Sequence, residues 1–141
     1  MPVTVKRVYE DPARADGYRV LVDRLWPRGL TKDAAHVDLW LKEIAPSNEL
    51  RRWYHARPLQ WPAFREKYRA ELSQGDAFQA FQELQALATT NKRVTLLYSS
   101  KDTERNNATV LKELLDGTRK PPRSTGAAGA AVRVAKRAQM K

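Results

Sequence analysis

The order of hydrophobic and polar positions divides most of this chain into short strands and amphipathic helices. Residues 3–8, VTVKRV, alternate between apolar and polar side chains, a pattern typical of a strand near the edge of a sheet. Residues 18–24 and residues 93–100 each have a continuous apolar centre, which predicts strands covered on both faces. Residues 36–44 fit the period of a strand and that of a helix about equally well, and we interpret them as a short strand.

Between these strands, apolar positions recur at the spacing of a helix face. Ser47 is a suitable N-cap for a short helix over residues 48–54. Pro62 suits the first turn of a second helix, and Gly75 separates that helix from a third. The residues expected on the buried faces are Phe64, Tyr68 and Leu72 in the second helix and Phe78, Phe81, Leu84, Leu87 and Ala88 in the third.

A last helix should follow the strand over residues 93–100, with Asp102 or Thr103 as its N-cap and Gly117 as its stop. Its buried face should contain Leu111, Leu114 and Leu115. Strands separated by helices predict an α/β fold, with a small, largely parallel sheet flanked by helices. We expect the strands over residues 18–24 and 93–98 to be parallel and central in that sheet.

Charge is distributed unevenly along the chain, whose net charge is +10. Residues 1–118 contain 19 Lys and Arg against 16 Asp and Glu, whereas residues 119–141 contain 7 Lys and Arg and no acid. The last residues are rich in Pro, Gly and Ala and have little apolar area to bury. We therefore expect a domain over residues 1–117 and a basic, disordered tail over residues 118–141.

Composition and motifs exclude several classes of chemistry. The chain has no cysteine, which excludes disulfides, thiol catalysis and cysteine zinc sites and fits a cytoplasmic protein. We expect no signal peptide and no membrane segment, because no long apolar run occurs. His36 and His55 have no partner at metal-ligand spacing, so no metal site is predicted. No glycine-rich phosphate or dinucleotide loop is present, so no cofactor is predicted.

Two polar segments follow the two buried strands. DRLWPRG, residues 23–29, follows the first, and YSSKDTERNN, residues 98–107, includes the end of the second. If the strands are parallel, both segments lie at the carboxyl edge of the sheet, where α/β proteins bind ligands. Arginine recognises phosphate and carboxylate groups with two parallel hydrogen bonds. The candidate ligand-binding residues are Asp23, Arg24, Trp26, Arg28, Tyr98, Lys101, Asp102 and Asn106.

In this hypothesis Arg24 and Arg28 clamp an anionic group, and Asp23 and Asp102 orient the arginines or move a proton. Trp26 shields the site from water, and further polar contacts come from Tyr98, Lys101 and Asn106. The alternative is structural: residues 23–29 would form a corner of the fold, and Asp102 would only cap a helix. No catalytic residue can be assigned from the sequence, and whether the protein is an enzyme is left open.

Several segments together resemble the YeaO-like bacterial family of unknown function. In chain order they are KRVYE, DGYRVLVDRLWPRGL, WLKEIAPSNELRRW, FREKYRAEL and VTLLYSSKDTERNNATVLKELL. The resemblance covers about residues 4–116 and implies a small cytoplasmic α/β protein, but it supplies no activity. Members often have a histidine where this chain has Asn107, so the resemblance implies no acid–base role for that position here.

Three functions are compatible with the sequence. The favoured one is a binding site for an anionic small molecule at the carboxyl edge of the sheet. A second is a nucleic-acid-associated protein whose basic tail, residues 119–141, contacts phosphates without sequence preference. A third is an interaction module without a ligand. None of the three involves a membrane.

Overall fold

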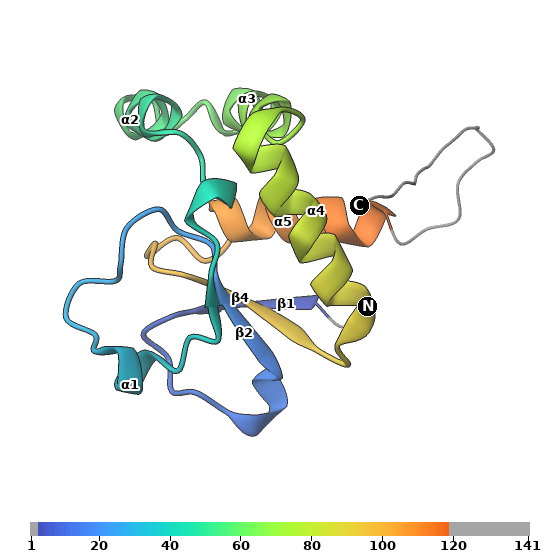
Figure 1. Ribbon diagram of the computed structural model, residues 1–141. Coiled ribbons are helices and arrows are strands. Elements are labelled where there is room, and N and C mark those ends of the chain that lie inside the picture. The colour runs from blue at the N-terminus through green and yellow to red at the C-terminus, as the bar shows by residue number, and fades with distance from the viewer. Residues whose placement is uncertain (1–2, 119–141) are drawn as a thin grey trace.

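Four parallel strands form one sheet in the order β1-β4-β2-β3, as a computed structural model describes for residues 3–118 (Figure 1). The tail predicted over residues 118–141 lies outside the described residues, except for Thr118, the last residue of the final helix. The strands are β1 (Val3–Arg7), β2 (Tyr18–Leu21), β3 (Leu39–Trp40) and β4 (Val94–Tyr98). The helices are α1 (Lys32–Ala35), α2 (Asn48–Ala56), α3 (Trp61–Glu71), α4 (Gly75–Thr90) and α5 (Asn107–Thr118), with 3-10 turns η1 (Arg14–Asp16) and η2 (Lys42–Ile44).

The strand order confirms the predicted α/β fold, with β2 and β4 parallel and central and β1 at an edge. All four strands are shorter than the segments predicted for them. β2 ends at Leu21 rather than at residue 24, although the Val22 amide still donates to the Leu97 carbonyl. β3 contains two residues, because the chain turns into η2 directly after Leu41.

The two faces of the sheet have different cover. Val20 and Leu96, paired in register, face the main core, to which α2, α3, α4 and α5 all contribute. Leu21 and Leu97 face a smaller core with Ala35 of α1 and the loop that follows β2. Figure 1 shows α4 and α5 above the sheet and α1 below it. Cover on both faces confirms what the continuous apolar centres predicted.

The helices match the sequence prediction at α2 and α3 and differ from it at α4. The Ser47 hydroxyl accepts a hydrogen bond from the Leu50 amide at 3.0 Å, as expected of an N-cap. All three residues predicted to be buried along α3 are buried. In α4, Leu84 and Ala88 are buried, but Phe78 is 41% exposed, so its prediction as a core residue was wrong. Phe78 lies about 120° around the helix from Leu84, outside the buried face.

The start and end of α5 also differ from the prediction. The Asp102 carboxylate accepts hydrogen bonds from the Glu104 and Arg105 amides, both at 2.9 Å, and closes a turn before the helix. Asn106 is the residue that caps α5, because its side-chain oxygen accepts from the Thr109 amide at 2.9 Å. The helix therefore begins three to four residues later than predicted, and it continues through Gly117 to Thr118.

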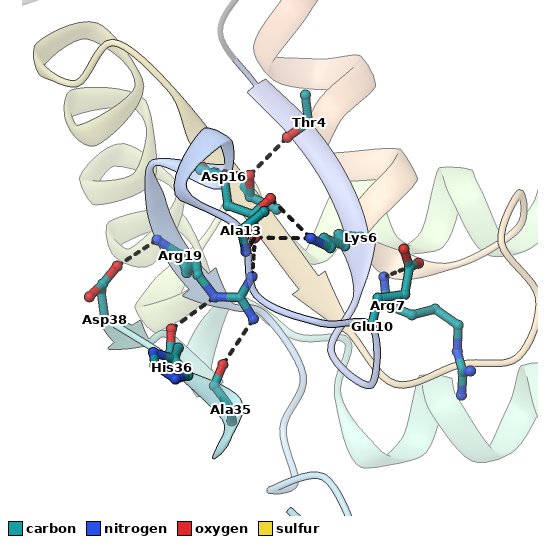
Figure 2. A network of polar contacts seen from close by, with 11 residues as sticks. Thr4, Lys6, Arg7, Glu10, Ala13, Asp16, Arg19, Ala35, His36 and Asp38 are labelled. Carbon is teal, nitrogen blue, oxygen red and sulfur yellow. Dashed lines mark hydrogen bonds and ion pairs between the residues drawn. The ribbon is translucent and has the colours of Figure 1, made fainter. Parts of the chain in front are cut away.

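A buried polar network joins β1, β2 and α1 on the second face of the sheet (Figure 2). Arg19 is 4% exposed and donates to the Asp16 carboxylate and to the backbone carbonyls of Ala35 and His36. Asp16 also accepts from Lys6 at 3.1 Å and from the Ala13 amide at 2.9 Å. Each buried charge thus has a partner of opposite sign, which burial of a charge requires.

The network predicts an acid-dependent loss of stability. Burial alone would raise the pKa of Asp16, but hydrogen bonds from Ala13, Lys6 and Arg19 outweigh it and hold that pKa below its usual value. A carboxyl whose pKa is lower in the folded state stabilises the fold above its unfolded-state pKa, and this contribution is lost as pH falls through the folded-state value. We expect Asp16→Asn to lower the free energy of unfolding at neutral pH and to flatten its decline below about pH 4.

Urea unfolding at a series of pH values measures this decline. Asp11, in the exposed loop before η1, provides the control, because its side chain makes no polar contact with another described residue. Asp11→Asn should keep the acid dependence of the wild type. An equally steep decline in Asp16→Asn would show that Asp16 is not the group responsible.

Gly17 is the position where the backbone leaves no room for a side chain. Its φ is +68°, and a Cβ there would lie 2.4 Å from the carbonyl oxygen of Arg93, which precedes β4. Gly29 has a similar φ of +83° and no atom within 4 Å of its Cβ position, so it is a matched control. We expect Gly17→Ala to destabilise the protein by at least about 1 kcal/mol more than Gly29→Ala, measured by denaturant unfolding. Equal losses of stability in the two variants would mean that the positive φ alone, and not the contact with Arg93, causes the destabilisation.

Candidate anion-binding cleft

A cleft of about 660 Å³ opens at the carboxyl edge of the sheet, beyond the ends of β1, β2 and β4. We call it the rim cleft. Its walls come from the segments that follow these three strands and η2, together with α2, α3 and the start of α5. The residues that line it are Arg7, Tyr9, Asp23, Arg24, Leu25, Trp26, Pro27, Arg28, Ala45, Pro46, Arg51, Tyr54, Phe64, Ser99, Ser100, Lys101, Arg105, Asn106 and Asn107.

Asp23 joins three parts of the rim. One carboxylate oxygen accepts hydrogen bonds from the amide and the hydroxyl of Ser99, both at 2.8 Å, and the other accepts from the Asn107 side chain at 3.2 Å. The Asp23 carbonyl accepts from the Trp40 indole at 2.7 Å. The end of β2 is thereby tied to β3, to the end of β4 and to the start of α5. Asp23 is therefore a residue that shapes the cleft.

Arg24 is half-buried and holds the segment that precedes α2. Its guanidinium donates to the carbonyls of Ala45 at 3.1 Å and Pro46 at 3.3 Å. These bonds fix one wall of the rim cleft, because Ala45 and Pro46 both line the cleft. The side chain still contributes a positive charge to the cleft, but its position is set by the protein backbone.

A hydrogen bond from the indole of Trp26 closes the loop over residues 25–30. Trp26 donates to the Leu30 carbonyl at 2.7 Å, and its ring meets that of Trp40 edge-on, with the centroids 5.4 Å apart. From the segment after β1, the Tyr9 hydroxyl donates to the Arg28 carbonyl at 2.8 Å. The backbone of Arg28 is thus held in place, while its side chain is exposed and lines the cleft.

The cleft has an excess of positive charge. Arg7 is engaged with the carbonyls of Ser99 and Ser100, but the side chains of Arg28, Lys101 and Arg105 donate no hydrogen bond to any described residue. Asp23 is the one carboxylate among the lining residues of the described chain, and both of its oxygens are already bonded. An anion entering the cleft would therefore meet cationic side chains whose hydrogen-bond donors are not engaged by the described chain, although Arg105 also interacts electrostatically with Asp102.

Six of the eight residues predicted for the site lie together in the rim cleft: Asp23, Arg24, Trp26, Arg28, Lys101 and Asn106. Asn106 is buried there and is occupied as the cap of α5. The structure places the other two outside it. Tyr98 is 2% exposed within the main core, where burial raises the pKa of its hydroxyl. Asp102 lines a neighbouring hollow.

Sequence reasoning missed several lining residues, and some of them carried a usable signal. Arg7 lies at the end of the strand predicted over residues 3–8 and Tyr9 follows it, and this end reaches the same edge because β1 is parallel to β4. Arg105 lies in the polar segment already singled out after β4. Arg51 and Tyr54 come from α2, and no local pattern places that helix beside the rim. Asn107 donates to the Val22 carbonyl at 2.7 Å as well as to Asp23.

No cluster of three or more metal-ligating side chains occurs among residues 3–118. Within the same range, every helix is too short or too polar to span a bilayer.

The fold and the rim cleft define a class of protein: a small α/β domain whose parallel sheet ends in a cationic cleft. The model of a family described as the inactive DUF488-N3 subclade matches residues 2–129, and the chain belongs to this family. It is 47% identical to the uncharacterised protein YeaO of Escherichia coli strain K12 over 117 aligned residues. The aligned segment covers 82% of this chain and 97% of YeaO. Family membership confirms the resemblance seen in the sequence motifs.

A second relative is an uncharacterised protein of Mycobacterium tuberculosis strain H37Rv, 43% identical over 115 residues, which are 82% of this chain and 94% of that protein. No solved structure matches the chain.

Removing the Asp23 carboxylate should loosen the rim. We expect Asp23→Ala to lower the free energy of unfolding by about 2–4 kcal/mol, because the Ser99 and Asn107 donors lose their acceptor. Ser99→Ala removes one of these bonds and should cost about 1 kcal/mol. Denaturant unfolding compares the two variants, and equal losses would contradict a central role for the carboxylate.

Proposed function

We propose that the protein binds an anionic small molecule, with a phosphate-like or carboxylate group, in the rim cleft. The observation that carries the proposal is the set of cationic side chains that donate no hydrogen bond within the described chain, Arg28, Lys101 and Arg105, at the carboxyl edge of a parallel sheet. Ligands of α/β proteins bind at such edges, and arginine suits planar anions. Following the family resemblance and the absence of cysteine, we propose a cytoplasmic location.

The residues have different roles in this proposal. Arg28 and Lys101 contact the anion directly, while Asp23 and Arg24 keep the walls in position. Trp26, which packs under the loop over residues 25–30, limits the access of water to the anion. The volume of about 660 Å³ lies within the range of small-molecule sites.

Binding is better supported than catalysis. Asp23 is the lining group that would act as a general base, and its oxygens accept three hydrogen bonds that hold the fold together. The family description, which calls the subclade inactive, points in the same direction.

Arg28→Ala tests the proposal. Loss of one charged hydrogen-bond partner should weaken the binding of a phosphate-like or carboxylate anion by about 10- to 150-fold, corresponding to about 1.5–3 kcal/mol. Folding should be unaffected, because the Arg28 side chain is exposed and donates to no described residue. Inorganic phosphate, sulfate and citrate are suitable probes for titration calorimetry and thermal shift.

Arg69→Ala is the control, since Arg69 is an exposed residue of α3 outside the rim cleft and its loss removes the same charge. The anion site is disproved if no probe stabilises the wild type more than Arg28→Ala. It is equally disproved if both variants bind the probes alike.

A further inference from the structure

A second hollow adjoins the rim cleft. It has a volume of about 860 Å³ and lies between α2 and the turn that precedes α5. Four residues line both spaces: Arg51, Tyr54, Ser100 and Arg105. Because these residues are shared, the two spaces form one extended trough rather than two separate sites. Arg52 and His55 of α2 line only the second hollow.

The trough contains the whole of the positive charge excess of the domain. Seven Lys and Arg side chains and two Asp side chains line it. The other residues up to 118 comprise twelve Lys and Arg and fourteen Asp and Glu, so the remainder of the domain is slightly acidic. One trough acid, Asp102, accepts two backbone amide hydrogen bonds, and these bonds lower its pKa. The excess of positive charge is larger than one small anion would neutralise. It is suited to an extended ligand with several negative charges.

Apolar and aromatic surface runs along the same trough. Tyr54 lines both spaces while its ring packs on Phe64, with the centroids 4.6 Å apart. In the rim cleft, Leu25 is 62% exposed and Tyr9 is 40% exposed. A bare polyphosphate chain would leave these faces unused. A nucleic acid strand offers both phosphates for the arginines and flat bases for the apolar and aromatic faces.

We infer that the trough binds a short single strand of nucleic acid, whose phosphates lie along the arginines of both spaces. This inference rests on the proposed anion site and extends it, because the ligand reaches from Arg28 at one end to Arg52 at the other. It is independent of the basic tail, since every residue it uses belongs to the domain.

The test uses the full-length protein and fluorescent oligothymidylates of about two, four and eight nucleotides, titrated at low salt. Affinity should rise with length. Arg52→Ala and Arg28→Ala should each weaken binding of the longest strand about 5- to 20-fold relative to the charge-matched Arg69→Ala. Inorganic phosphate should distinguish the two ends: Arg28→Ala should lose phosphate binding, whereas Arg52→Ala should retain it.

Three results would overturn the inference. If Arg52→Ala binds the strand as well as Arg69→Ala does, the ligand does not reach the second hollow. In that case, loss of phosphate binding in Arg28→Ala would still support the proposed anion site. If all three variants bind the strand equally, the contact lies outside the trough. If inorganic tripolyphosphate displaces the strand as well as an unlabelled oligothymidylate of equal charge, the bases make no contact, and the ligand is a free polyphosphate.

Discussion

The hydrogen bonds of one carboxylate, Asp23, set the geometry of the carboxyl edge. Parallel strands are not joined by tight turns, so their ends have no local connection to hold them together. Asp23 supplies that connection through Ser99 and Asn107, and its own carbonyl receives the Trp40 indole. A negative charge is also favourable here, because it offsets repulsion among the surrounding arginines. The cleft can therefore be strongly cationic and still have well-placed walls.

Five arginines of the described chain fall into two groups. Arg7, Arg19 and Arg24 donate to backbone carbonyls at the ends of segments, where these carbonyls need donor partners because regular structure stops. Arg28 and Arg105 donate to no such group among the described residues. The side chains of the first group hold neighbouring segments of the fold together. Those of the second group remain hydrated, so a ligand can replace their water. The same residue type thus provides both the support and the recognition.

The sequence predicted the strands and a sheet flanked by helices because continuous apolar centres and helical spacing are local signals. It also predicted six of the residues that meet in the rim cleft, since both segments follow buried parallel strands. Tyr98 is different: it shares a strand face with Val94 and Leu96, and strand alternation places it in the core. Arg19 could not be predicted as buried, because its partners come from a loop and from α1, which no periodicity brings together.

The sheet has little unprotected edge to offer another chain. At one side, β3 is two residues long and is followed at once by η2, so its backbone presents almost no row of free hydrogen-bonding groups. At the other side, β1 carries Lys6 and Arg7 at its carboxyl end. Short and charged edge strands resist edge-to-edge aggregation. A protein built this way can carry a parallel sheet of only four strands and still be expected to resist edge-to-edge pairing with its own copies at high concentration.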